Sequence, residues 1–292
     1  FTTPVGITQL RVEIAGGSGN GNLKVFRDSP NAVPVCDLRQ LTSNEVCTQG
    51  WSDPRAEILA HRVSAMARHF GGELDVSRQH SEAALGLSGP FGRTRVAAAI
   101  GPEAVVAAKA VLCRTLWIQG ETEKALETAS DAVARAEAVG NSVSLCAALY
   151  GACAVALWSG ELELARKWVP RMIEEARRKG LEGWYRYAEW FDQGLKLRTS
   201  PDRNLHVRQV REQIAHYDAP HQEMLLTFCL DWLDDAVIDR VTAGEGLWCA
   251  AEAWRALGWR EEQGGNLEEA GRHYRHAVDT ARQQGALNWE LR

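Results

Sequence analysis

The chain has 292 residues, of which 45% are apolar and 24% charged, a composition ordinary for a globular protein of one large or two modest domains. Its net charge of −5 excludes a strongly basic nucleic-acid-binding surface. No run approaches 18 apolar residues, so we expect no transmembrane helix and no membrane partner. The chain starts with Phe1 and stops within a repeated pattern at Arg292, so we expect it to be a piece of a longer protein.

Residues 1–50 differ in kind from the rest and predict a short antiparallel β segment. Apolar and charged residues alternate over 10–14 and again over 23–25, the period of a half-buried strand. The glycine-rich run 16–22 between them predicts a connecting turn. A phosphate-binding loop would need Gly-Lys-Ser/Thr at the start of a helix, which is absent here.

This segment resembles the first half of the bacterial pre-peptidase C-terminal domain, a β-sandwich appended to secreted peptidases. The matching residues are Phe1-Thr-Thr-Pro-Val-Gly6, Leu10-x-Val12-x-Ile14, Gly16-Gly-Ser-Gly19, Leu23-x-Val25, Pro34, and Cys36 with Cys47. The resemblance implies a partial β-sandwich over 1–50. In that family such a cysteine pair can form a disulfide, and two free thiols are the alternative.

From residue 51 onward, apolar residues recur at helical spacing and predict a mainly α domain over 51–292. Asp53 and Pro54 are typical of a helix start. The predicted helices form pairs over 54–70 with 74–85, 94–118 with 122–138, 142–158 with 162–179, and 181–198 with 203–217. Residues 220–242 are apolar and helical but fit the pairing poorly, which predicts a shortened unit.

A glycine followed five residues later by an alanine occurs three times and marks the second helix of a pair. The three copies are Gly120 with Ala125, Gly160 with Ala165, and Gly265 with Ala270. The alanines of the first two copies are 40 residues apart, more than the 34 of a standard tetratricopeptide repeat. One such unit cannot bury its apolar face alone, so the copies predict an α-solenoid.

The last unit, 248–284, resembles the tetratricopeptide repeat most clearly. It departs from that pattern at Glu261, where an aromatic is usual, and no proline closes it. Small residues are needed where two helices cross, and larger ones fill the space beside them. The residues expected to pack the repeats are Cys113, Ala125, Cys153, Ala165, Trp254, Leu257, Gly258, Ala270, Tyr274 and Ala277.

The block from about residue 101 to 292 resembles the C-terminal repeats of large bacterial signalling proteins, in which a winged-helix or cyclase module and an ATPase precede tetratricopeptide-like repeats. The matching residues are Leu116-Trp-Ile-Gln-Gly120, Asn141-Ser-Val-Ser-Leu-Cys146, Ala156-Leu-Trp-Ser-Gly160 and Gln284-Gly-Ala-Leu-Asn-Trp-Glu-Leu-Arg292. The resemblance implies a cytoplasmic sensing or interaction arm of a signalling ATPase or transcriptional regulator, without the other modules.

No pattern predicts catalysis, a cofactor or a metal site. The five cysteines outside residues 1–50 lie in helical patterns, where buried thiols are expected. His273 and His276 are three residues apart on one helix, but metal binding needs further converging ligands, so a solvated face is the better interpretation. No Ser-His-Asp or Cys-His arrangement can be proposed from the spacing.

The only candidate site is the concave face, which the first helices of each pair line in tetratricopeptide solenoids. Residues turned away from the packing positions are expected there: Arg114, Trp117, Tyr150, Glu252, Arg255, Trp259 and Glu262. Exposed Trp, Tyr and Arg are typical binding anchors. The alternative for Trp117 and Trp259 is packing between neighbouring repeats.

The leading hypothesis is a non-enzymatic solenoid that binds a protein, a peptide or a small effector in its concave groove, without contacting nucleic acid itself. The alternative is a secreted, peptidase-associated accessory protein whose β module binds matrix or polymer, which would place it outside the cell. A third possibility is that two unrelated pieces are joined, because half a sandwich leaves unpaired strand edges. We expect residues 1–50 to be the less stable part.

Overall fold

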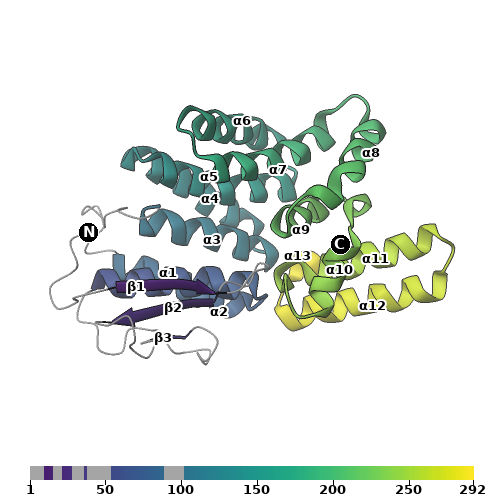
Figure 1. The fold of residues 1–292 in the computed structure, drawn as a ribbon, viewed down its shortest axis with the longest axis horizontal. Coiled ribbons are helices and arrows are strands. Elements are labelled where there is room, and N and C mark those ends of the chain that lie inside the picture. The colour runs from purple at the N-terminus through teal and green to yellow at the C-terminus, as the bar shows by residue number, and fades with distance from the viewer. Residues whose placement is uncertain (1–9, 16–21, 28–35, 38–53, 89–101) are drawn as a thin grey trace.

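Antiparallel helix pairs make up most of the described chain and follow one another as a solenoid (Figure 1). This computed structural model describes residues 10–15, 22–27, 36–37, 54–88 and 102–292. In Figure 1 the pairs rise from α1 and α2 to α6 and α7, after which α8 to α10 lead the chain back toward α11, α12 and α13. The mainly helical, repeated architecture expected from the sequence is therefore confirmed.

Three short strands precede the helices: β1 (Leu10–Ala15), β2 (Asn22–Arg27) and β3 (Cys36–Asp37). They form an antiparallel sheet in the order β1-β2-β3, with Val12 paired to Val25. The remainder of the expected sandwich, and Cys47 of the expected disulfide, lie outside the described residues. The pre-peptidase resemblance stays a prediction.

Four helix pairs form the first part of the solenoid. They are α1 (Pro54–Phe70) with α2 (Leu74–Ser88), α3 (Ala104–Ile118) with α4 (Thr122–Val139), α5 (Ser142–Ser159) with α6 (Leu162–Arg178), and α7 (Glu182–Thr199) with α8 (Arg203–Gln213). Of the expected helix over 94–118, α3 covers Ala104–Ile118, whereas residues 94–101 lie outside the described residues. The Glu103 carboxylate accepts a hydrogen bond from the Val106 N–H at 3.0 Å and so caps a helix that begins at Ala104.

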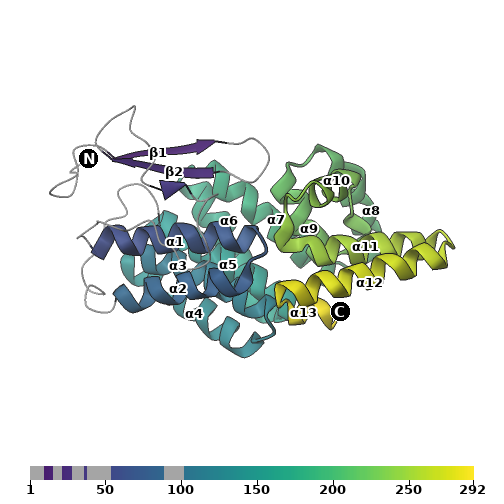
Figure 2. The same ribbon diagram turned by 90° about the horizontal axis from the view of Figure 1, so that it is seen from below.

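The chain then leaves the regular repeat and returns to it. Helices α9 (Ala219–Phe228) and α10 (Asp235–Thr242) are short and are separated by a 3-10 turn, as the poor fit of 220–242 predicts. The last pair is α11 (Ala250–Gln263) with α12 (Leu267–Gln284), followed by one turn of helix, α13 (Leu287–Glu290). Figure 2 shows α13 turned back toward α3.

The repeated glycine-to-alanine spacing has a direct structural cause. Gly120, Gly160 and Gly265 have φ angles of 94°, 76° and 81°, a left-handed conformation that glycine adopts without steric cost. The alanine five residues later is buried in each copy, at 0%, 0% and 3% exposure. The spacing therefore fixes both the turn and the small residue at the helix crossing.

The first helices of successive pairs contact one another in series, α1 with α3, α3 with α5, and α5 with α7. In α5 most residues are buried, which explains why its sequence is apolar on all sides. By length and composition α5 could cross a membrane, but 72% of it is buried inside the protein, as in a core helix. The interspersed Ser144 and Gly151 make this stretch easy to overlook in the sequence.

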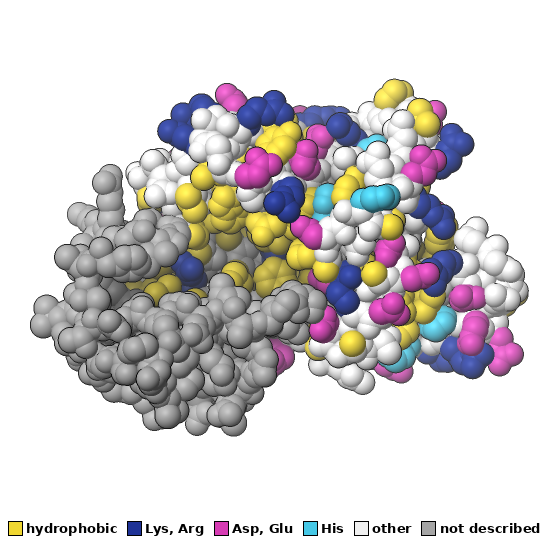
Figure 3. All heavy atoms as spheres, in the orientation of Figure 1, with side chains coloured by type: hydrophobic (Ala, Val, Ile, Leu, Met, Phe, Trp, Pro, Cys, Tyr) yellow, Lys and Arg dark blue, Asp and Glu magenta, His cyan; other side chains and the backbone are white. Residues whose placement is uncertain are grey.

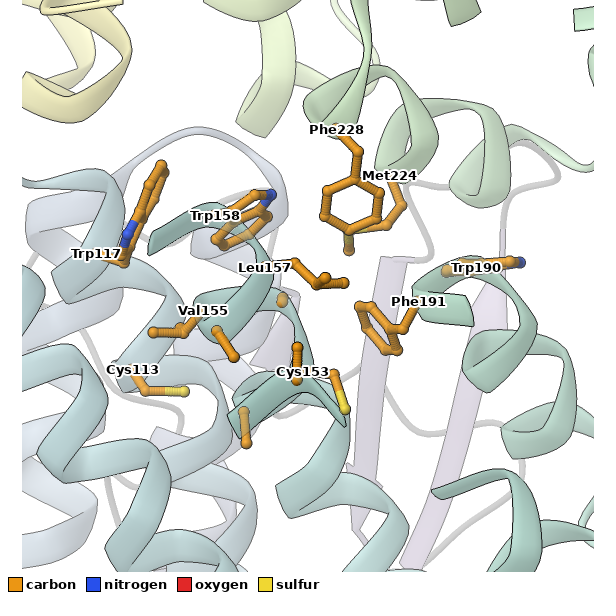
Figure 4. Packing of buried hydrophobic residues seen from close by; sticks show 14 of the residues in the cluster. Cys113, Trp117, Cys153, Val155, Leu157, Trp158, Trp190, Phe191, Met224 and Phe228 are labelled. Carbon is orange, nitrogen blue, oxygen red and sulfur yellow. The ribbon is translucent and has the colours of Figure 1, made fainter. Parts of the chain in front are cut away.

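The core continues from α5 into the irregular region. Figure 4 shows Phe191 of α7 directed toward Leu157 of α5, with Met224 and Phe228 of α9 on the other side. The ring centroids of Phe191 and Phe228 are 6.4 Å apart. One continuous apolar cluster thus joins the regular pairs to the returning segment.

We predict that Gly151→Ala lowers the free energy of unfolding by about 1–3 kcal/mol, because added volume at a packed crossing forces the backbone apart. A Cβ at Gly151 would lie 2.5 Å from the Ala110 carbonyl oxygen and 2.9 Å from Cys113 Sγ. The matched control is Gly183→Ala in α7, where a Cβ meets nothing within 4 Å. Urea unfolding of both variants tests this, and equal stability of the two would contradict it.

Two histidines from α1 and α2 meet inside the first pair. His61 Nδ1 and His80 Nδ1 are 2.9 Å apart, and both side chains are buried. Burial, followed by the neighbouring His61 and Arg68 charges, lowers the pKa of His80 to about 4. Burial also lowers the pKa of His61, partly opposed by Glu57. The pair is therefore neutral near pH 7.

We predict that stability is greatest above the unfolded-state histidine pKa of 6.5 and falls as the pH drops toward 4, because only the unfolded chain takes up these protons. The loss attributable to His80 is about 1–3 kcal/mol. Thermal unfolding of the wild type and His80→Asn between pH 4 and 8 measures it. If the melting temperatures of the two proteins changed equally with pH, His80 would not be the source of the pH dependence.

Candidate ligand-binding site

Half-buried aromatic side chains of α5 and α7 form a strip of rings in mutual contact. The Tyr150 ring lies 6.3 Å from Trp184 and 5.2 Å from Tyr187, measured between ring centroids. Trp184 and Tyr187 are themselves 5.6 Å apart and nearly perpendicular. We call these three residues the aromatic strip. Figure 3 shows hydrophobic side chains gathered over α3, α5 and α7, where this face is hollowed.

Beneath the strip lies a buried arginine, Arg114 of α3, which is 2% exposed. Its guanidinium carbon is 5.0 Å from the Tyr150 ring centroid and 5.0 Å from that of Trp248. Phe70 and Trp158 complete the surround at 5.2 and 5.7 Å. These distances are within the range of favourable cation–π contacts.

The C-terminal turn α13 packs against α3 and against α11 and α12. Trp289 packs edge-on against Trp117 of α3, with ring centroids 5.0 Å apart. Asn288 donates a hydrogen bond of 2.5 Å to the Trp117 carbonyl oxygen. Arg292 lies over both indole rings, at 5.0 Å from Trp117 and 4.8 Å from Trp289. We call residues 288–292 the C-terminal clasp.

Two buried carboxylates connect the clasp and the last pair to the interior. Glu252 of α11 accepts hydrogen bonds from Arg255 and from Arg292, at 2.7 and 3.1 Å. Glu223 of α9 accepts hydrogen bonds from Trp248 Nε1 at 3.0 Å and Arg240 Nε at 3.2 Å. Burial raises the pKa of Glu223, and these two donors oppose that shift.

The residues expected on the concave face do not form a row of exposed binding residues. Arg114, Trp117 and Glu252 are buried, whereas Tyr150, Arg255 and Trp259 are half-buried and Glu262 is exposed. The structure brings Arg114 against Tyr150. Glu262 lies apart from them in the last pair, where it accepts a hydrogen bond from the Tyr274 hydroxyl.

Several residues of the interior were not expected from the sequence: Phe70, Trp158, Trp248, Trp289 and Arg292. Trp117 and Trp158 each stand shortly before a turn glycine, Gly120 and Gly160, and this recurrence was the available signal. The other members come from segments that meet only in the folded chain, so no sequence spacing connects them.

Most of the residues expected to pack the repeats are buried, and their packing role stays a prediction. Those that are buried are Cys113, Ala125, Cys153, Ala165, Leu257, Gly258, Ala270 and Ala277. A Cβ on Gly258 would lie 2.8 Å from the Tyr274 ring, so glycine is needed there. Trp254 is half-buried and stacks on His276, with ring centroids 4.3 Å apart.

The five cysteines within residues 102–292 are free and buried. Burial raises the pKa of Cys113 and Cys146 to about 12 and that of Cys229 to about 11, so these thiols are protonated near pH 7. No group of three or more metal-ligating side chains occurs within residues 54–88 and 102–292.

Comparison with known proteins finds similarity at the level of fold. One similar solved structure is a crystal structure of a Rap protein complexed with competence and sporulation factor, with a TM-score of 0.60 and 13% identity over 81% of this chain and 67% of that one. Another is the apo form of RapI, with a TM-score of 0.54 and 11% identity over 81% of this chain and 87% of that one. No family model and no curated protein matches the sequence. The chain thus shares the helical-repeat fold of Rap proteins.

We predict that Trp289→Ala lowers the free energy of unfolding by about 3–5 kcal/mol, the usual cost of emptying a buried tryptophan site. The side chain is 3% exposed and joins the last residues to α3. The control is Leu291→Ala, because Leu291 is 74% exposed and its loss should change stability by less than about 0.5 kcal/mol. Similar denaturation midpoints for both variants would show that the clasp contributes little.

Proposed function

We propose that this chain is a non-enzymatic scaffold that binds an extended segment of protein or peptide along the inner face of its solenoid. The observation that carries the proposal is the aromatic strip of Tyr150, Trp184 and Tyr187, half-buried beside the buried cation of Arg114. Aromatic and arginine side chains in partly desolvated positions are the usual hot spots of recognition.

The fold supports the same proposal. A Rap protein with this fold was crystallised in complex with competence and sporulation factor, so the architecture can hold a regulatory factor. Solenoids present extended concave surfaces that suit extended ligands. The buried, protonated thiols and the lack of a metal-ligand group among the described residues also favour binding over catalysis.

We further propose that the chain is the sensing arm of a larger bacterial signalling protein, as the resemblance of residues 101–292 implies. Five free, buried cysteines suit a reducing, cytoplasmic compartment. Binding at the inner face would then be communicated through the packing of the first helices against one another. We also propose that residues 1–50 and residues 51–292 form two separate domains.

The proposal predicts that peptides selected from a random decapeptide library on the immobilised protein bind through the aromatic strip. Trp184→Ala should weaken their binding at least about tenfold, the effect of losing one aromatic hot spot of about 1.4 kcal/mol. Fluorescence anisotropy with dye-labelled peptides measures the dissociation constants.

The matched control is Trp254→Ala. Trp254 is also half-buried but stacks on His276 in the last pair, away from the strip. Its loss should leave the affinity unchanged. Equal weakening by both substitutions, or the recovery of no peptide with micromolar affinity, would contradict binding at the strip.

A further inference from the structure

One buried charged side chain among the described residues has no partner of opposite charge. Three carboxylates are buried, and each accepts a hydrogen bond from an arginine: Glu103 from Arg135, Glu223 from Arg240, and Glu252 from Arg255 and Arg292. Arg114 is as deeply buried, but no carboxylate among the described residues forms an ion pair with it. Its Nε and Nη2 atoms are inaccessible to solvent and have no hydrogen-bond partner within the described chain.

Aromatic rings compensate this cation only in part. Four cation–π contacts stabilise the guanidinium, but they cannot replace the hydrogen bonds that its N–H groups form in water. The rings also leave the directional N–H groups without acceptors. Two further buried donors nearby, the indole N–H groups of Trp117 and Trp289, have no acceptor among the described residues either. Among the described residues, Arg114, Trp117 and Trp289 are thus buried donors without an acceptor.

We propose that Arg114 anchors a carboxylate of the bound ligand, so that the ligand class is a peptide bearing an acidic side chain or a free C-terminus. The inference rests on the proposed function, because it assigns the chemistry recognised at the end of the aromatic strip. Arg114 presents its guanidinium beside Tyr150, which belongs to the strip.

A carboxylate fits this position better than a phosphate. A guanidinium pairs with a carboxylate through two parallel N–H···O bonds in one plane. The surrounding rings of Phe70, Tyr150, Trp158 and Trp248 leave apolar walls around that plane. A planar carboxylate with apolar flanking groups matches such walls, whereas a tetrahedral phosphate leaves oxygen atoms facing aromatic carbon.

Access requires a local movement. Arg114 is 2% exposed, whereas Phe70 and Tyr150 above it are only partly buried. A change in the Tyr150 side-chain rotamer uncovers the guanidinium from the side of the strip. No carboxylate of the described residues pairs with the cation, so ligand binding breaks no ion pair within that part of the chain.

The test compares a peptide selected on the intact protein with the same peptide after methyl esterification of its carboxyl groups. The wild type should bind the free-acid form at least about thirtyfold more tightly, as expected for a desolvated charge-assisted pair. Arg114→Met should remove that preference and leave the affinity for the ester unchanged. Arg114→Lys keeps the positive charge but cannot donate two parallel hydrogen bonds. It should therefore retain only part of the preference for the free acid.

The charge-matched control is Arg166→Met, because Arg166 lies on α6, is half exposed, and pairs with Glu163. It should keep the full preference for the free acid. If peptides bind the wild type through the strip but the acid and ester forms bind equally, the carboxylate assignment is wrong while the proposed function stands.

If no peptide is recovered, the proposed function fails, and a second probe decides the inference separately. Sodium acetate, compared with sodium chloride at equal ionic strength, should raise the melting temperature of the wild type and of Arg166→Met but not of Arg114→Met. Equal effects of both salts on all three proteins would overturn the assignment. A larger stabilisation by phosphate than by acetate, lost in Arg114→Met, would replace the carboxylate with a phosphate ligand.

Discussion

Trp158 joins parts of the chain that are far apart in sequence, and the shape of the interior depends on it. Its ring packs against Trp117 of α3, Trp248 before α11, and Trp289 of the clasp, at centroid distances of 5.0, 6.2 and 5.7 Å. Its indole N–H donates a hydrogen bond of 2.8 Å to Thr227 Oγ1. A solenoid held only by neighbour contacts would stay open. This cluster ties the last pair to the first ones.

Because the last pair packs against the first ones, charged side chains are buried that would be exposed to water on an open solenoid. Glu252 of α11 and Arg292 of the clasp neutralise each other there. Arg114 is enclosed by the same rings but has no such partner among the described residues. An unpaired buried cation is destabilising, and such residues persist mainly where function needs them. Under the proposed function, Arg114 lies where a carboxylate of the ligand would bind.

The repeat itself could be read from the sequence because its determinants are local. Gly160 fixes a turn and Ala165 a helix crossing, and both act within one unit. The irregular α9 and α10 could be recognised only as a poor fit, because short helices there are specified by their packing against α7 and α11. The strand alternation over 10–14 coincides with β1, but the sandwich it suggested stays a prediction.

The site was predictable only in part. Tyr150 and Arg114 belong to first helices, so the sequence could associate them with the concave face. It could not reveal that Arg114 is enclosed, because Trp248 reaches it only through the return of the chain. Trp117 was expected either to bind a ligand or to pack, and the structure places it in packing contact with Trp158 and Trp289. Its role as an anchor stays a prediction.

The central claim is that ligands bind inside the closed solenoid and not on its outer helices. Hydrogen–deuterium exchange of the full chain, with and without a saturating selected peptide, tests it most directly. The account predicts slower exchange in the segments of α5 and α7 that carry Tyr150 and Tyr187, with no change in α4, α6 or α12. Protection confined to those outer helices, with α5 and α7 unchanged, would contradict it.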